Sequence, residues 1–286
     1  MAASVLFDEP GPVTRRRHQL YGVVLAVLLI AVLWWVYLKL KAGGELEPEV
    51  FEDLSQENVW RAIGEGVVAT LKAAAISIVL AVGLGFLLAT GRLSEHAPVR
   101  IPCRWVIEFF RAVPVLLMMI FFFGFLAQNF DFETETNALV AVVAGLTLYN
   151  GAVLAEVFRA GVNAVPRGQV EAAYAIGLRK GQVLRIVQTP QAVRYMLPAI
   201  ISQCVVTLKD TALGFIITYG ELLRQGKSIA EFVHNNLITF LLIAVIYIAM
   251  NSALSLLASW LERRMSVRGH SARDAVLQVE EVLPVG

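Results

Sequence analysis

The sequence contains little charge and very few cysteine or histidine residues. Aspartate, glutamate, lysine and arginine together make up 16% of the 286 residues, whereas soluble proteins carry roughly 25%. The 24 basic and 23 acidic side chains leave a net charge of +1, so there is no excess of positive charge to hold nucleic acid. Two cysteines exclude a disulfide framework, and four scattered histidines exclude a His-rich metal site.

The sequence instead contains long apolar runs. Apolar and aromatic residues make up 57% of the chain and the mean hydropathy is +0.67, which is more apolar surface than a soluble fold could cover. A helix needs about 20 apolar residues to cross a bilayer, and these runs are continuous rather than alternating, which disfavours a barrel. We therefore expect an all-α integral membrane protein with six transmembrane helices. The expected spans are residues 20–38, 67–90, 105–128, 138–158, 196–219 and 237–261.

The first apolar run has a second interpretation. Arg15, Arg16 and Arg17 precede it, as basic residues precede the core of a signal peptide. The run is longer than the roughly 7–15 residues of such a core, and no clear A-x-A cleavage site follows it. We therefore favour a retained span over a cleaved leader.

The distribution of basic residues predicts the orientation. Sixteen of the 24 lysines and arginines share one side if the N-terminus, the loops 91–104 and 159–195 and the C-terminal tail lie there. Because basic loops remain in the cytoplasm, we expect both termini to be cytoplasmic and the chain to be a multi-pass protein of the plasma membrane. The expected divisions are a cytoplasmic segment 1–18, an additional span 19–40, an extracytoplasmic amphipathic segment 45–66, a transmembrane domain 67–262 and a cytoplasmic tail 263–286.

The segment 45–66 combines acidic residues with a weak helical pattern. Phe51, Leu54 and Trp60 recur at roughly helical spacing among seven carboxylates. This pattern favours an amphipathic helix on the outer surface, and a solvated acidic linker is the alternative.

The longest cytoplasmic connection, the 161–195 loop, has the pattern of two short amphipathic helices. Gly177 and Gly181 offer a place to turn between them, and we expect the second helix to end before Pro190. Two short helices joined by a glycine bend suit docking to another protein better than catalysis. The apolar positions are Val170, Ala173, Tyr174 and Leu178 in the first helix and Val183, Leu184 and Val187 in the second.

Charged residues inside the spans cost roughly 2.5–3.5 kcal/mol each, so they need partners or a function. Glu108 and Arg111 lie three residues apart near the inner end of the third span, as do Glu156 and Arg159 in the fourth. Residues three apart share a helix face, so each pair can form an ion pair. The pairs are either structural or parts of a cytoplasmic gate.

The fifth span carries a polar stripe on an otherwise apolar helix. The stripe lines either a water-filled pathway shared with a partner protein or a polar contact between helices. In a pathway, Asp210 would suit an ammonium group and Lys209 or Arg111 a carboxylate, and Asn150 of the fourth span would add an amide. The stripe consists of Gln203, Thr207, Asp210, Thr211, Gly214 and Thr218.

Motifs for nucleotide binding and catalysis are missing. Residues 220–228, GELLRQGKS, place five residues between the glycines, where a phosphate-binding loop has four. No H-E-x-x-H, C-x-x-C or G-x-S-x-G motif occurs. We expect neither an enzyme activity nor a cofactor in this chain.

The 161–195 loop resembles the EAA loop of ABC importer permeases. Glu171-Ala172-Ala173, then Gly177, Val187 and Thr189-Pro190, follow the pattern E-A-A-x3-G-x9-I-x-L-P, with Val for Ile and a departure from Leu at Thr189. Further segments resemble the polar amino acid branch of this family, and the additional first span is most similar to permeases of GluD-type glutamate importers. These segments are residues 70–72, 110–114, 149–151, 156–161, 166–169 and 208–211.

The resemblance implies the fold of a type I ABC importer permease for a polar amino acid, with glutamate the expected substrate. It also implies an extracytoplasmic binding protein, two cytoplasmic ATPase subunits that bind ATP and Mg²⁺, and a second permease, which we expect to be a different chain. The alternatives are an ion- or proton-coupled secondary transporter that uses Asp210 and a membrane-bound enzyme or scaffold. The residues that would couple to the ATPase are Glu171, Ala172, Ala173, Gly177 and Pro190.

Overall fold

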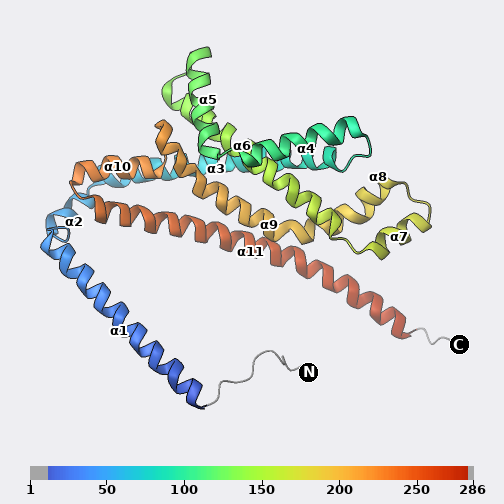
Figure 1. Ribbon diagram of the computed structural model, residues 1–286, viewed down its shortest axis with the longest axis horizontal. Helices are drawn as coiled ribbons and strands as arrows, with labels where there is room; N and C mark the ends of the chain where they lie inside the picture. Colours follow the sequence, from blue (N-terminus) through green and yellow to red (C-terminus); the bar gives the residue numbers. More distant parts are fainter. Residues whose placement is uncertain (1–11, 283–286) are drawn as a thin grey trace. The chain divides into compact units, whose positions relative to one another are not determined.

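The computed structural model describes the backbone of residues 12–282 and the side chains of residues 14–260 (Figure 1). Residues 1–11 and 283–286 of the expected terminal segments lie outside this range. Every regular element in the described part is helical, and the chain divides into two compact units, residues 1–56 and 57–286. The first unit holds α1 (Pro12–Ala42) and α2 (Pro48–Leu54). The second holds α3 (Glu57–Arg92), α4 (Ala97–Ala112), α5 (Val115–Asn129), α6 (Thr134–Asn163), α7 (Arg167–Ala175), α8 (Lys180–Gln182), the π-helix η1 (Val183–Gln188), α9 (Thr189–Asp210), the 3₁₀-helix η2 (Thr211–Ile217), α10 (Leu222–Val233) and α11 (Asn236–Val282).

In the described part of the chain, five helical stretches are long and apolar enough to span a bilayer, and the count is six if the bent pair of α4 and α5 is one span. The prediction of an all-helical, multi-span membrane protein is therefore confirmed, and the predicted six spans match the upper count. The helices extend beyond the apolar runs that predicted them, because polar residues at their ends continue the helix outside the hydrocarbon. The clearest case is α11, which crosses as residues 236–260 and continues through the expected tail to Val282.

The third predicted span is not one continuous helix. α4 and α5 meet at a bend of 98°, and Val113 between them is extended at φ −81° and ψ 126°. Pro114 explains the break, because its ring disfavours helical geometry in the preceding residue and it has no N–H to donate. The prediction of an unbroken helix over 105–128 was wrong.

The helix that forms the fifth predicted span has other boundaries than we expected. We expected the second helix of the 161–195 loop to end before Pro190, but the six-residue π-helix η1 leads directly into α9. The wider π turn accommodates the missing N–H of the proline and the bulk of its ring. At its far end, α9 tightens into η2, which ends at Thr218 in the left-handed region with φ 63°. The expected regular α-helix to residue 219 is therefore wrong beyond Asp210.

The first unit is a long apolar helix followed by a short one. The apolar side chains of α1 are exposed, and none of the residues in its most apolar window is buried within the chain. α2 ends at Leu54 and a break at Ser55 and Gln56 separates it from α3. The segment 45–66 is therefore two helical pieces rather than the single helix that its pattern favours.

The core of the second unit is the contact between α3 and α6. Small residues line this contact, and a Cβ added to Gly85 would lie only 3.0 Å from the carbonyl oxygen of Gly151. Such close approach is typical of helix packing in membranes, where there is little hydrophobic driving force between helices. Val170 and Leu184 of the 161–195 loop pack against the inner part of this core. The core thus reaches from the spans into the loop.

Candidate functional site

Four of the predicted pathway residues form hydrogen bonds within the helix bundle, and two of them join α6 to α9. Asn150 is fully buried and donates from Nδ2 to the Leu146 carbonyl at 2.8 Å. Gln203 donates from Nε2 to the Asn150 Oδ1 at 2.5 Å, so the two amides join α6 to α9. The hydroxyls of Thr207 and Thr211 donate to carbonyls of the preceding turn. Since Asn150, Thr207 and Thr211 are buried, this part of the stripe lies in a helix contact and not along an open pathway.

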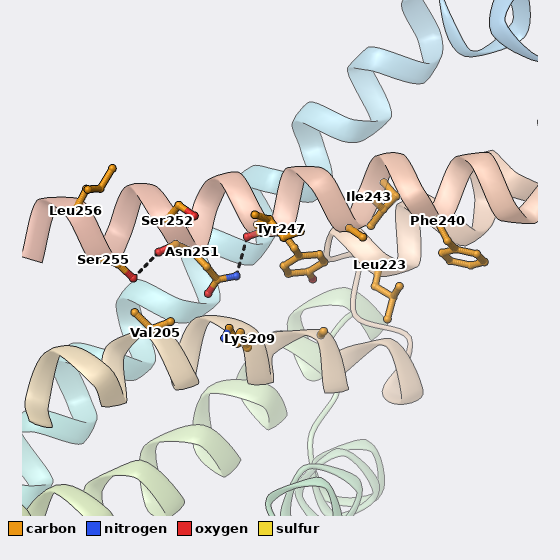
Figure 2. Close-up of a pocket in the computed structure, with 13 residues that line it drawn as sticks. Val205, Lys209, Leu223, Phe240, Ile243, Tyr247, Asn251, Ser252, Ser255 and Leu256 are labelled. Atoms are coloured by element: carbon orange, nitrogen blue, oxygen red, sulfur yellow. Dashed lines mark hydrogen bonds between the residues drawn. The ribbon is translucent and has the colours of Figure 1, made fainter. Parts of the chain in front are cut away.

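Lys209 lies on a different face of α9, where it lines an open groove of about 960 Å³ (Figure 2). The groove runs between α9 and α11, and Leu223 of α10 contributes to its wall. Lys209 forms no ion pair with any side chain that the structure describes. An unpaired ammonium beside an open volume can bind an anionic group.

The polar residues that face Lys209 across the groove come from α11, and the sequence analysis missed them. Asn251 donates to the Tyr247 carbonyl at 2.7 Å, and Ser255 donates to the Asn251 carbonyl at 2.8 Å (Figure 2). The Oδ1 of Asn251 is buried and has no hydrogen-bond partner among the described residues. The signal was present, because Tyr247, Asn251 and Ser255 recur every four residues in an apolar span.

Asp210 and Arg111 do not meet Lys209 in an ion pair. Asp210 is the last residue of α9 and is partly buried. Arg111 is exposed near the end of α4, and neither residue forms an ion pair within the described part of the chain. The groove therefore contains Lys209 but neither of the other two charged residues that we expected along a pathway.

A second hollow of about 610 Å³ lies near the N-terminal ends of α3 and α6. Lys72, Glu65 and Glu135 are its charged lining residues, and Tyr219 forms part of its wall. The phenol of Tyr219 donates to the Ala69 carbonyl at 2.8 Å, and burial raises its pKa to about 12. This hollow is more acidic than the groove beside Lys209.

The two expected ion pairs at the inner ends of the spans have different outcomes. Glu156 does pair with Arg159 at 2.9 Å, and it also pairs with Arg92 of α3 at 2.5 Å. Glu108 pairs with Arg104 at 2.8 Å and not with Arg111. The expected pair of Glu108 with Arg111 was wrong, because the residue one turn earlier on the same face satisfies the carboxylate.

The 161–195 loop contains the expected glycine bend. α7 ends at Ala175, and Gly177 has φ +82°, a conformation that side chains with a Cβ rarely adopt. The N–H of Leu178 returns to the Ala173 carbonyl at 3.2 Å, which closes the helix end in a Schellman motif. The second glycine, Gly181, lies within α8 and makes no turn.

The surface of the loop combines exposed motif residues with exposed apolar ones. Glu171, Ala172, Gly177 and Pro190 are exposed, whereas Ala173 is buried. The large exposed apolar side chains are Tyr174, Ile176, Ile186, Val193 and Tyr195, of which Ile176 is 78% exposed. Apolar side chains exposed next to basic ones are typical of a surface that binds another protein.

One ion pair joins the loop to the rest of the chain, because Lys180 pairs with Glu95 of the α3–α4 connection at 2.9 Å. Within the loop, Gln191 donates to Gln169 at 2.6 Å and so joins the start of α9 to α7. The hydrogen bond from Lys180, together with its charge, lowers the pKa of the Glu95 carboxyl. The loop is therefore joined to α3 as well as to α6 and α9.

Comparison with known proteins places this helical bundle among membrane permeases. Residues 81–267 match the family described as "Binding-protein-dependent transport system inner membrane component", and the chain belongs to this family.

Its relatives are amino acid permeases. The chain is 40% identical over 243 residues to the glutamate transport system permease protein GluD of Corynebacterium glutamicum. This alignment covers 85% of the chain and 89% of the relative. It is 29% identical to the glutamate/aspartate import permease protein GltK of Escherichia coli, over 70% of this chain and 92% of the relative. A crystal structure of an amino acid ABC transporter matches 74% of this chain and 97% of its own, with 30% identity and a TM-score of 0.68.

These matches confirm the resemblance that the motifs indicated. The chain is the permease subunit of an amino acid ABC importer, a multi-pass protein of the plasma membrane with the type I importer fold. Family membership therefore argues against a secondary transporter that uses Asp210 as its coupling carboxylate.

Proposed function

We propose that this chain is the permease subunit of a glutamate importer. The support is its 40% identity, across 85% of its length, to a permease described as part of a glutamate transport system. In this proposal an extracytoplasmic binding protein delivers the amino acid, and two cytoplasmic ATPase subunits bind ATP and Mg²⁺. A second permease, a different chain, completes the transmembrane pathway, and both termini of this chain face the cytoplasm.

The groove between α9 and α11 is the proposed passage for glutamate. Glutamate carries two carboxylates and one ammonium group near neutral pH, so its net charge is negative. Lys209 is a cation, and no aspartate or glutamate is among the described residues that line the groove. Asn251 also lines the groove and adds a side-chain amide to it. By contrast, the second hollow has two carboxylates and one lysine, which suits an anion less well.

The 161–195 loop is the proposed contact with the ATPases. Glu171, Ala172, Ala173, Gly177 and Pro190 match the family motif residue by residue. Since the loop continues directly into α6 at one end and into α9 at the other, a movement of the loop displaces both spans. ATP-driven closure of the ATPases would thus open and close the groove, as in other alternating-access transporters.

The test is uptake of radiolabelled glutamate by cells that lack the chromosomal copy and express tagged variants. Lys209→Met keeps an unbranched side chain of similar length and removes its charge. Loss of a charge-assisted hydrogen bond costs about 1.5–3 kcal/mol, so we expect uptake at low glutamate concentration to fall by roughly tenfold or more. Lys72→Met makes the same change in the second hollow and is the matched control, for which we expect uptake within twofold of the wild type.

Two results would contradict the proposal. If Lys72→Met abolishes uptake and Lys209→Met leaves it intact, the passage lies in the second hollow. If unlabelled arginine or glutamine competes with the tracer better than unlabelled glutamate does, the substrate assignment is wrong. The amount of each variant in the membrane is measured through the tag.

A further inference from the structure

Glu221 is a fully buried carboxylate in the connection between η2 and α10. Its exposed fraction is 0%, although an acidic residue is almost never fully buried unless its oxygens are paired. The backbone N–H groups of Leu223 and Arg224 donate to its carboxylate at 2.7 and 2.8 Å. These two bonds make Glu221 the N-cap of α10. Burial raises the pKa of this carboxyl.

The N-cap bonds do not account for the third partner of Glu221. The phenol of Tyr247, on α11, donates to the Glu221 Oε2 at 2.6 Å. The same Tyr247 lines the groove, and its ring projects from α11 toward α9 (Figure 2). The carboxylate therefore holds in place a side chain that the groove exposes.

The connection that contains Glu221 is bound to α3. The N–H of Leu222 donates to the Thr70 hydroxyl at 3.1 Å, and the phenol of Tyr219 donates to the Ala69 carbonyl at 2.8 Å. A Cβ added to Gly66 would lie 2.9 Å from the Leu222 Cα, so the connection sits directly against α3. Tyr247 is thus joined, through Glu221, to a backbone segment that is itself bound to the core helix.

We propose that Glu221 is a positioning residue for substrate binding, because it fixes the ring of Tyr247 as a wall of the groove. The inference rests on the proposed function, since it takes the groove as the binding place of glutamate. Glu221 does not touch the substrate. Its effect is to keep the groove at the width and shape in which Lys209 and Asn251 can engage the amino acid together.

Glu221→Asp separates positioning from helix capping. Aspartate is among the best N-cap residues, so the cap of α10 can persist. Its side chain is shorter by one carbon–carbon bond, about 1.5 Å, which takes the carboxylate out of hydrogen-bond reach of Tyr247. Tyr247→Phe keeps the aromatic ring and removes the same hydrogen bond from the other side, together with the contact of the Tyr247 hydroxyl with Thr70.

The experiment measures equilibrium binding of radiolabelled glutamate to the purified importer complex without its binding protein. We expect each single variant to raise the Kd by roughly three- to tenfold, the effect of one hydrogen bond. The double variant should bind no more weakly than Tyr247→Phe alone, because Tyr247→Phe already removes the hydrogen bond that Glu221→Asp removes. Thermal unfolding of the same samples reports on any loss of folding.

The outcomes separate the inference from the function on which it rests. A wild-type Kd in Glu221→Asp, or a double variant with the product of the two single effects, would overturn the positioning role and leave Glu221 as a helix cap. Lys209→Met in the same assay reports on the groove itself. If Lys209→Met leaves the Kd unchanged, glutamate does not bind in the groove and the proposed passage fails. If Lys209→Met weakens binding while the Glu221 and Tyr247 variants do not, only the positioning role fails.

Discussion

At the scale of single residues, Glu156 is notable because it takes part in two ion pairs. It pairs with Arg92 and Arg159, and the side chains of Glu156 and Arg92 are each only 17% exposed. Because Arg92 comes from α3 and Glu156 from α6, this ion pair joins the two core helices near their inner ends. Removing the carboxylate would leave two guanidinium groups without their counter-charge.

We therefore expect Glu156→Met to destabilise the permease by about 1–3 kcal/mol, because it leaves partly buried guanidinium groups without their hydrogen-bond partner. The midpoint of thermal unfolding of the purified complex measures this loss. The double variant Arg92→Met with Glu156→Met should lose less, because only the Arg159 guanidinium is then left without its partner. Glu108→Met is the control, since its pair with Arg104 is largely exposed and its loss should change the midpoint little. Equal losses in Glu108→Met and Glu156→Met would show that the partly buried pairs of Glu156 contribute no more to stability than an exposed pair.

The sequence predicted which residues are polar within the spans, but only in part what each one does. Lys209, Gln203 and Thr207 all occur in one span, and the sequence does not state which face of that span meets α6 and which meets α11. The tie between Asn150 and Gln203 depends on residues 53 positions apart. The place of Asn251 in the groove was not predicted, because it depends on how α11 packs beside α9. Roles that depend on local spacing, such as the pairing of Glu156 with Arg159, were predictable.

At the scale of helices, α3 packs so closely on α6 that the contact leaves little space for side chains. A Cβ on Gly85 would lie 2.9 Å from the Leu154 Cβ, whereas a Cβ on Gly83, two residues earlier, would meet nothing within 4 Å. The two glycines share one helix and differ only in which side of it they occupy. They are a matched pair for measuring the contact.

We expect Gly85→Ala to be less stable than Gly83→Ala by about 1–3 kcal/mol, the usual effect of overpacking. Both changes gain the same helix propensity of roughly 1 kcal/mol, so the difference between them reports on packing alone. Thermal unfolding of the two variants in detergent gives the comparison. If both shift the midpoint equally, the close contact of α3 with α6 does not limit stability.

Pro114 and Pro190 disturb their helices in different ways. Pro114 ends α4 in an extended residue, whereas Pro190 lies within the first turn of α9 and the helix continues through it. The sequence predicts a disturbance at each proline, and both disturbances occur. Whether the result is a bend of 98° or a π turn depends on what packs around the proline, which local sequence does not specify. The number of spans was predictable because it depends on length and apolarity alone.

At the scale of the whole molecule, the 161–195 loop connects the inner ends of three spans. It continues α6, leads into α9, and reaches the end of α3 through the ion pair of Lys180 with Glu95. Its apolar side packs on the inner core through Val170 and Leu184. A force applied to the loop therefore acts on α3, α6 and α9 together.

The bend at Gly177 decides how the loop presents its surface, and two glycines test this. Gly177 has φ +82°, whereas Gly181 lies in a helical turn, and an added Cβ meets nothing within 4 Å at either position. A β-branched residue is a genuine outlier at positive φ, so Gly177→Val should reorient α7 relative to α8 without creating a clash. We expect Gly177→Val to reduce ATP-dependent glutamate uptake at least fivefold and to reduce the amount of ATPase that co-purifies with the tagged permease. Gly181→Val should leave both quantities within twofold of the wild type, because helical geometry admits valine. If the two variants behave alike, the φ of Gly177 does not govern coupling. If Gly177→Val loses uptake but keeps its ATPase, the bend transmits motion to α6 and α9 without being needed for docking.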